Sequence, residues 1–270
     1  MSPRNKQFKD FRSERAEPKR EPSDRGDWIY GRRPVLEVVK ADKRHLYEAV
    51  LPLEGHDAPE VAELRGLLIG RGVPFKALDR EELDALCEGG HHQGVAVRTG
   101  GFPYISIDQV IHDVKADPNA LVLLLDHIED PQNVGSILRS ADAAGVTAVL
   151  LPEDRAAGVT PAAVRASAGA SEHMRVAKVV NLVRAMQELK ECGIWLTGLD
   201  IGQDAKTYTS LDFKGRVGLV VGSEGKGLSR LVRETCDFVA CLPMKGRVES
   251  LNAGVAGAIA LYEIVRQRGQ

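Results

Sequence analysis

Short apolar runs separated by helical patterns dominate the second half of the chain. The first run, residues 121–125, is wholly aliphatic, as expected for a strand that is covered on both faces. Similar runs recur at residues 147–151, 174–180, 194–199, 217–221 and 238–242. Strands that alternate with helices predict a mainly parallel sheet, in which ligands bind beyond the carboxyl ends of the strands.

A shorter alternation of elements precedes this sheet. Its spacing of apolar positions predicts helices at 34–41, 59–71 and 81–87 and strands at 45–51, 73–78 and 94–98. Two glycines and a proline in residues 99–103 are typical of a linker. We therefore expect a small α/β domain at 28–98, a linker and lead-in at 99–120, and a second domain at 121–270.

The first 27 residues have a different composition. They contain eight Lys or Arg, six Asp or Glu and three Pro, with almost no aliphatic side chains. Such a segment cannot bury enough apolar surface to offset the entropy lost on ordering. We expect a disordered charged tail at 1–27, which either contacts RNA or only keeps the protein soluble.

The overall composition narrows the class of protein. The 270 residues are 43% hydrophobic and 27% charged, which is typical of a globular protein. No apolar run approaches the roughly 20 residues of a membrane span, and the N-terminus carries no secretory pattern. The four cysteines have no CxxC spacing, so no metal site is expected. The net charge of −2 argues against a uniformly basic coat but leaves room for a local nucleic-acid patch. We expect a cytoplasmic protein without membrane contact.

The segment after the first apolar run carries the first candidate chemistry. Pro131 is expected to interrupt helical structure and Asn133 to cap the helix that follows. Gly135 permits close approach of another backbone, and Gly145 is well placed to end the helix. Arg139 falls inside this helix, away from its apolar positions, where an arginine is usually an ordinary surface residue.

A second loop, residues 222–229, surrounds Glu224 with three glycines and indicates a backbone that approaches a ligand closely. It does not match a P-loop, because Val220 and Gly227 stand where Gly and Ser or Thr are needed. It does not match the dinucleotide fingerprint either, because Arg230 replaces a glycine. These mismatches argue against a phosphate-cradling nucleotide enzyme.

The third loop, residues 242–252, ends at Asn252, which is placed to cap the helix expected at 253–267. That helix lacks a continuous polar face over most of its length. One of its sides carries Val255, Ile259 and Tyr262. Because a helix that is apolar nearly all round is normally buried on two sides, we expect a homodimer, most simply a twofold one.

Together the three loops resemble the signature motifs of the SpoU family, the TrmH-like branch of the SPOUT RNA methyltransferases. The matching residues, in chain order, are Asn133, Gly135, Arg139, Gly222, Glu224, Gly227, Pro243, Met244, Gly246, Ser250, Leu251 and Asn252. The resemblance extends over residues 121–267. Residues 28–98 are similar to the substrate-binding domain of the same family, which has an L30e-like fold.

The resemblance implies an α/β protein in which a small L30e-like α/β domain precedes a SPOUT trefoil-knot domain with a mainly parallel sheet. It implies S-adenosylmethionine as the cofactor and transfer of a methyl group to a ribose 2′-hydroxyl of RNA. The cofactor-binding residues would be Leu199, Gly222, Leu242, Met244, Leu251 and Asn252. The catalytic residues would be Asn133, Arg139, Glu224, Ser250 and Asn252.

Within that set, the guanidinium of Arg139 would act as a fixed cation beside the oxygen that develops negative charge, since an arginine stays protonated in proteins. Glu224 would orient Arg139, and Asn133 would hold the ribose. Arg32 and Arg33 are candidates for phosphate contacts with RNA.

The two-domain members most similar in layout methylate a guanosine ribose in a loop of 23S-type large-subunit rRNA, which is therefore the expected substrate. Two alternatives remain open at this stage. One is a tRNA ribose 2′-O-methyltransferase, and the other is a non-catalytic RNA-binding assembly factor with the same fold.

Overall fold

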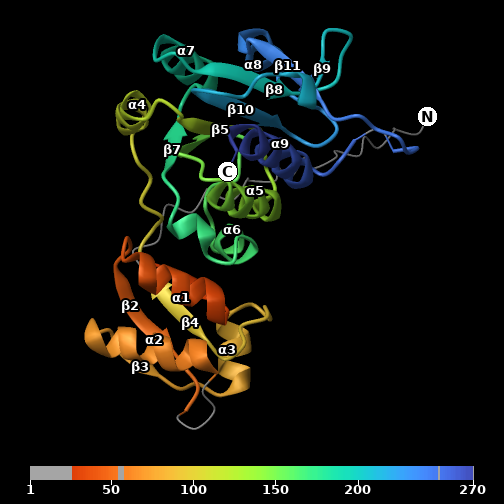
Figure 1. Cartoon of the computed structure of the whole chain (residues 1–270). Coiled ribbons are helices and arrows are strands. Elements are labelled where there is room, and N and C mark those ends of the chain that lie inside the picture. The colour runs from red at the N-terminus through yellow and green to blue at the C-terminus, as the bar shows by residue number, and fades with distance from the viewer. Residues whose placement is uncertain (1–25, 54–57, 249, 270) are drawn as a thin grey trace, which may run out of the picture.

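The computed structural model describes residues 26–53, 58–248 and 250–269. Most of the charged tail expected at 1–27 lies outside these residues. Asp27 is described, and it already belongs to the first strand, β1 (Asp27–Tyr30), one residue before the boundary expected for the N-terminal domain. Within the described residues the strands form two sheets, one of four strands and one of seven, which lie at opposite ends of the molecule (Figure 1).

The smaller sheet and its helices form the N-terminal lobe, residues 27–99. Its strand order is β1-β4-β2-β3, with β4 antiparallel to both of its neighbours. The remaining strands are β2 (Leu46–Val50), β3 (Phe75–Lys76) and β4 (Ala96–Thr99). The helices are α1 (Arg32–Ala41), α2 (Pro59–Gly70) and α3 (Arg80–Leu86). The sequence pattern predicted all of these except β1.

The larger sheet belongs to the C-terminal lobe, residues 107–268, and all of its pairings are parallel, as predicted. Its order is β7-β6-β5-β10-β8-β11-β9. The strands are β5 (Leu121–Asp126), β6 (Ala148–Pro152), β7 (Val176–Val179), β8 (Trp195–Leu199), β9 (Lys206–Thr207), β10 (Val217–Gly222) and β11 (Phe238–Cys241). The two-residue strand β9 was not predicted.

Helices cover both faces of this sheet (Figure 1). They are α4 (Ile107–Ala116), α5 (Pro131–Ala143), α6 (Pro161–Ala166), α7 (Leu182–Glu191), α8 (Arg230–Thr235) and α9 (Ala253–Arg268). The side chain of Leu123 belongs to the core formed with α5 and α9, whereas Leu124 belongs to the core formed with α4, α7 and α8. Every residue of β5 is buried, which confirms a strand covered on both faces.

The start of α5 differs from the expectation. Pro131 is the first residue of the helix, and Asp130 caps it by accepting a hydrogen bond from the Gln132 amide at 2.9 Å. Proline suits this position because its fixed φ is already helical and its missing N–H has no partner there. Asn133 therefore lies inside the first turn and does not cap it, while Gly145, at φ +68°, follows the C-terminus as expected.

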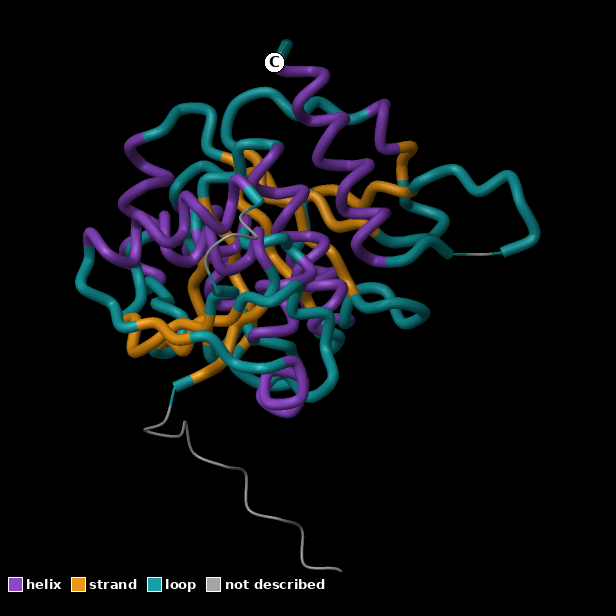
Figure 2. Tube along the Cα trace, turned by 90° about the horizontal axis from the view of Figure 1, so that it is seen from below, coloured by secondary structure: helices purple, strands orange, loops and turns teal. Residues whose placement is uncertain are grey.

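The segment 99–120 holds more structure than a linker. Ser106 and Gln109 form a capping box that starts α4, so half of this segment is helical. At the other end of the C-terminal lobe, the chain between β11 and α9 extends away from the body of the molecule (Figures 1 and 2). No helix in the described part of the chain has the length and apolar character needed to cross a membrane.

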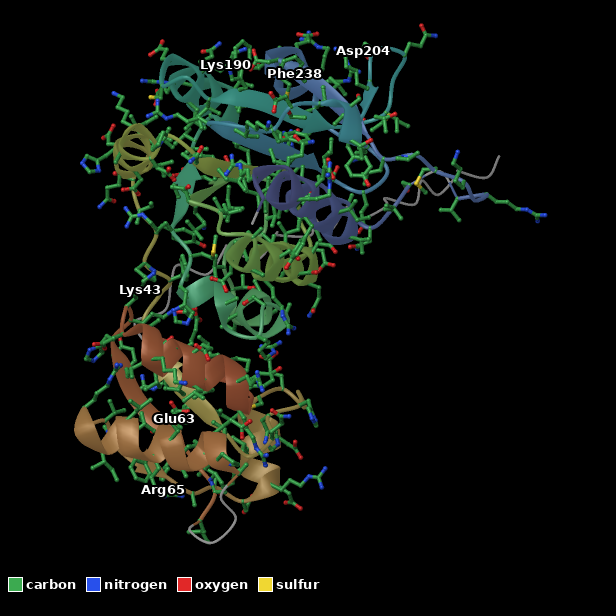
Figure 3. All side chains as sticks on the ribbon, in the orientation of Figure 1. Lys43, Glu63, Arg65, Lys190, Asp204 and Phe238 are labelled. Carbon is green, nitrogen blue, oxygen red and sulfur yellow. The ribbon has the colours of Figure 1, made fainter. Side chains whose placement is uncertain are left out.

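The two lobes are packed against each other. Arg44 of the N-terminal lobe forms an ion pair with Glu172, which lies in a short 3₁₀ helix, Ala170–Glu172, of the C-terminal lobe. Nearby, the ammonium group of Lys43 donates to the carbonyl of His173 at 3.2 Å (Figure 3). The imidazole of His173 contacts Glu37 at 2.8 Å. These contacts place the lobes at a defined orientation.

Candidate active site

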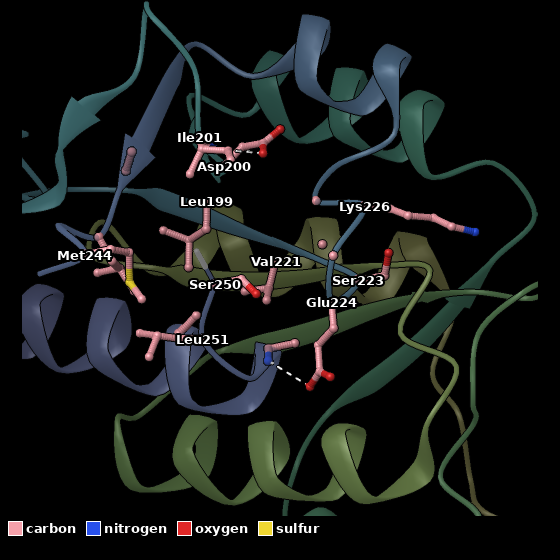
Figure 4. Close-up of a pocket in the computed structure, with 17 residues that line it drawn as sticks. Leu199, Asp200, Ile201, Val221, Ser223, Glu224, Lys226, Met244, Ser250 and Leu251 are labelled. Atoms are coloured by element: carbon pink, nitrogen blue, oxygen red, sulfur yellow. Dashed lines mark hydrogen bonds between the residues drawn. The ribbon is translucent and has the colours of Figure 1, made fainter. Parts of the chain in front are cut away.

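A pocket of about 230 Å³ opens at the carboxyl ends of β8, β10 and β11 (Figure 4). We call it the inner pocket. Its apolar lining residues include Leu199, Ile201, Leu242, Met244 and Leu251, and its polar lining residues are Asp200, Ser223, Glu224, Lys226 and Ser250. This position agrees with the rule that ligands of open parallel sheets bind beyond the carboxyl ends of the strands.

Glycines allow the 223–227 loop to fold tightly over this pocket. A Cβ atom on Gly222 would lie 2.3 Å from the carbonyl oxygen of Gly227. Gly227 itself has φ +64°, and a Cβ there would lie 2.6 Å from Oδ1 of Asp200. A side chain on Gly222 would therefore require a shift of the backbone, and one on Gly227 would be strained by the left-handed φ and would displace the Asp200 carboxylate. The glycines singled out in the sequence are therefore required by the close return of the loop.

Asp200 brings a carboxylate to the wall of the inner pocket. Its Oδ1 accepts a hydrogen bond from the Ile201 amide at 2.8 Å, and its Oδ2 lies 3.3 Å from Nε of Arg233. Arg233 also donates to Asp204 on the outer side, and this hydrogen bond lowers the pKa of the Asp204 carboxyl. The sequence analysis missed Asp200, although its place directly after an expected strand end was a usable signal.

The carboxylate of Glu224 joins the three loops. Its Oε1 accepts a hydrogen bond from Nδ2 of Asn133 at 3.0 Å and another from Nδ2 of Asn252. The backbone amide of Ala253, at the start of α9, donates to the same oxygen at 3.2 Å. Asn252 also donates to Oδ1 of Asn133 at 2.8 Å. Asn133 and Asn252 lie 91 and 28 positions from Glu224 in the sequence, and both contact its carboxylate in the folded chain.

Arg139 lies apart from this cluster. Its side chain is exposed on α5 and does not line the inner pocket or a second pocket described below. It is also absent from the described contacts of Glu224. The expected orientation of Arg139 by Glu224 is therefore not present within the chain. The geometry of α5 explains this separation. Arg139 lies six positions after Asn133, which corresponds to about 240° of rotation and about 9 Å along the helix axis.

A second pocket, about 480 Å³, lies on the other side of the 223–227 loop. We call it the outer pocket. It shares Ser223, Glu224, Lys226 and Gly227 with the inner pocket. Its other polar lining residues are His127, Glu129, Asp130, Asn133, Arg155 and Ser229. Glu224 therefore stands where the two pockets meet.

Most of the expected site residues lie in the inner pocket or in the Glu224 cluster. Leu199, Gly222, Leu242, Met244 and Leu251 line the inner pocket, as does Ser250. Asn252 caps α9 by accepting from the Val255 amide at 3.2 Å and belongs to the Glu224 cluster. Arg32 and Arg33 lie at the start of α1 in the N-terminal lobe, where Nε of Arg32 donates to the carbonyl of Gln93 at 3.3 Å. His127 and Arg155 were not predicted.

Comparison with known proteins follows the same division of the chain. The model of the SpoU rRNA Methylase family matches residues 120–262, and that of RNA 2′-O ribose methyltransferase substrate binding matches residues 28–104. A relative from Xylella fastidiosa (strain 9a5c), 23S rRNA (guanosine-2′-O-)-methyltransferase RlmB, is 38% identical over 90% of this chain and 98% of its own length.

Two solved structures extend the comparison. The SpoU methyltransferase AviRb from Streptomyces viridochromogenes, in complex with the cofactor AdoMet, is 28% identical with a TM-score of 0.73 and covers 89% of this chain and 90% of its own. The TrmH/SpoU tRNA modifying enzyme of A. aeolicus is 26% identical with a TM-score of 0.52 and covers 60% of this chain and 84% of its own.

Proposed function

The chain belongs to the SpoU rRNA methylase family, and we propose that it methylates the ribose 2′-hydroxyl of a guanosine in large-subunit ribosomal RNA, with S-adenosylmethionine as the donor. It is an RNA methyltransferase by family. Two facts about the Xylella fastidiosa relative support guanosine and 23S-type rRNA as the target. Its name gives this activity, and it aligns with this chain over 98% of its own length.

The proposal depends most on the carboxylate of Glu224, which draws the three motif loops together at the junction of the two pockets. A methyl transfer needs a donor and an acceptor held in line at one place. The inner pocket on one side of Glu224 and the outer pocket on the other supply two adjoining sites for such a pair.

The inner pocket suits the proposed cofactor. Leu199, Leu242, Met244 and Leu251 give an apolar wall for a flat adenine ring, and the carboxylates of Asp200 and Glu224 give acidic groups that favour a cationic ligand. AviRb, which has the same fold, was solved with AdoMet bound. When bound, the cofactor supplies an already activated methyl group.

The protein's own residues then have to position and polarise the acceptor. Glu224, Asn133 and Asn252 form a connected hydrogen-bond cluster that can hold a ribose hydroxyl in one orientation. Ser250 lines the inner pocket and shapes the third loop beside it. Arg139 keeps its proposed role as a cation beside the reacting oxygen, but it lies outside the pockets of its own chain, so a second protomer must bring it there.

A homodimer is part of the proposal, and α9 supports it. Val255, Ile259 and Tyr262 are 47%, 37% and 53% exposed and follow one another at helical spacing, while the opposite face of α9 is buried. An apolar stripe of this kind on a helix that packs against α5 is suited to a second copy of the chain.

The N-terminal lobe favours ribosomal RNA over tRNA. The tRNA modifying enzyme of A. aeolicus covers only 60% of this chain, whereas the 23S rRNA relative covers 90% of it. The additional residues match a substrate-binding model, and lobes of this type suit structured RNA. An rRNA substrate would also place the protein in the cytoplasm, among the enzymes of rRNA processing.

A trefoil knot in the C-terminal lobe completes the proposal. Its support is topological, because β10 lies between β5 and β8 in the sheet although it follows both along the chain. The other support for the knot is the resemblance to the SpoU family.

The decisive experiment is a map of ribose methylation in total RNA from cells with and without this protein. We expect one 2′-O-methylguanosine to disappear from large-subunit rRNA and to return when the purified protein and S-adenosylmethionine are added to that RNA. Loss of a ribose methyl group from tRNA, with an unchanged rRNA map, would contradict the proposed substrate.

A further inference from the structure

The outer pocket has the size and position of a nucleotide site. Its volume of about 480 Å³ lies within the range of roughly 300–1,000 Å³ that is typical of small-molecule pockets. It adjoins the inner pocket along Ser223, Glu224, Lys226 and Gly227. A nucleotide whose ribose reaches Glu224 must therefore place its base and its phosphate in the outer pocket or at its rim.

Arg155 presents a cation to this pocket from an unusual backbone conformation. Its φ is +54°, in the left-handed region that long side chains rarely adopt. The loop that carries it, between β6 and α6, is tied to the loop after β5 by a hydrogen bond from the Ala157 amide to the Ile128 carbonyl at 2.8 Å. The structure around Arg155 therefore holds this conformation in place, as is common at binding sites.

Arg155 has no acidic partner among the described residues, since no hydrogen bond or ion pair joins its side chain to them. The ionisable groups that face the pocket with it are His127, Glu129, Asp130, Glu224 and Lys226. The three carboxylates repel a phosphate, so a phosphate can lie only towards Arg155 and Lys226. The planar guanidinium of an arginine matches phosphate oxygens with two parallel hydrogen bonds.

His127 presents a flat ring to the same pocket. Its backbone is also left-handed, at φ +56°. Its Nδ1 lies 2.5 Å from Oδ1 of Asp126, whose side chain is buried and also accepts from the Ser229 amide at 2.6 Å. The imidazole is thus fixed at the pocket wall by a buried carboxylate. Unstacked RNA bases are commonly bound by stacking on aromatic rings, including histidine.

We propose that the outer pocket binds the nucleotide that is methylated, with its phosphate on Arg155 and its base against His127. This inference rests on the proposed function, and it names the residues of this chain that hold the substrate. The ribose then lies over Glu224, between the two pockets.

The test measures binding of RNA and binding of the cofactor separately on the whole chain, with a 23S rRNA transcript as the RNA probe. Arg155→Ala should weaken binding of the transcript and lower the slope of log K against log salt by about one, as loss of one phosphate contact requires. Arg155→Lys should recover part of the affinity. Binding of S-adenosylmethionine, followed by calorimetry, should stay unchanged, because Arg155 does not line the inner pocket.

His127→Gly keeps a residue that accepts the left-handed backbone and removes the side chain, including its contact with the buried Asp126. We expect it to weaken transcript binding roughly 5- to 160-fold, the range that corresponds to removal of a stacked ring. Arg184→Ala is the matched control for Arg155→Ala. Arg184 is an 80% exposed arginine on α7, on the far face of the sheet, and it is paired with Glu188.

Unchanged transcript affinity and salt slope in Arg155→Ala would overturn the proposal, as would a loss of cofactor binding in that variant. Both results are distinct from failure of the proposed function, which would appear as absence of methyl transfer by the wild-type protein to any rRNA.

Discussion

Arg44 and Glu172 form a two-point ion pair between the lobes, with Nε to Oε2 at 2.8 Å and Nη2 to Oε1 at 2.6 Å. The two side chains are 1% and 0% exposed. A pair with this geometry and burial cannot exchange its partner for water. Removing the charge of either residue leaves the other charge buried in the protein without compensation.

We expect Glu172→Gln to lower the free energy of unfolding by about 3–5 kcal/mol, because the guanidinium of Arg44 stays buried without its carboxylate. Urea denaturation of the purified protein measures the change. The double variant Arg44→Met with Glu172→Leu removes both charges and should be much less destabilised. If the single variant unfolds like the wild type, the ion pair does not hold the lobes together.

Glu224→Gln tests the charge at the junction of the pockets. The amide can still accept hydrogen bonds but no longer carries the negative charge, so we expect methyl transfer to fall by about 10²–10³-fold, as for other single electrostatic groups. Steady-state assays with the 23S transcript measure the rate, and circular dichroism checks the fold. Near-normal turnover would show that the cluster has only a structural role.

Arg139 allows a test of the dimer by complementation. Arg139→Ala and Glu224→Ala should each be nearly inactive alone. If Arg139 acts on the partner's site, random mixing of the two variants gives one intact site in each mixed dimer, so about one quarter of wild-type activity should return. Absence of any recovery after subunit exchange would place the function of Arg139 within its own chain, or nowhere.

Ile259→Glu should convert the dimer to monomers, because it puts a charge in the middle of the exposed stripe on α9. Sedimentation velocity at micromolar concentration measures the change. Val180→Glu is the control, since Val180 is 85% exposed and lies outside α9. A wild-type protein that sediments as a monomer would contradict the proposed dimer directly.

Burial raises the pKa of the Cys236 thiol to about 12 and that of Cys87 to about 11. Both thiols are therefore neutral at pH 8, and the thiolate that reacts with iodoacetamide is scarce. We expect both cysteines to be alkylated slowly in the native protein and rapidly after unfolding, which peptide mass spectrometry can follow. Complete native labelling of Cys236 within minutes would show that it is accessible and ionised.

The sequence predicted most strands of the C-terminal sheet because each is a mainly apolar run, as in β5 and β10, in which every residue is buried. It missed β9, because the two residues of that strand are exposed and give no apolar signal. It predicted the start of α5 wrongly. Pro131 begins this helix because proline is well suited to the first helical position. The hydrogen bond from the Gln132 amide to Asp130 identifies Asp130, and not Asn133, as the cap.

The contacts of the site were harder to predict than its residues. Asn133, Glu224 and Asn252 were all named from the sequence, yet their mutual hydrogen bonds depend on three loops that meet only in the folded sheet. Arg155 and the Arg44–Glu172 pair gave no signal, because their residues look like ordinary surface charges. Arg44 and Glu172 are separated by 128 positions, and no local pattern connects them.

The packed lobes also impose a length on the RNA. The start of α1, with Arg32 and Arg33, and the pockets of the C-terminal lobe are held at one separation by the contacts of Arg44, His173 and Lys43. An RNA that touches both must present its target ribose at that same distance from the element gripped by the N-terminal lobe. If the N-terminal lobe binds RNA through the start of α1, inserting base pairs between the two RNA elements would move the ribose away from the pockets, whatever the sequence of the inserted pairs.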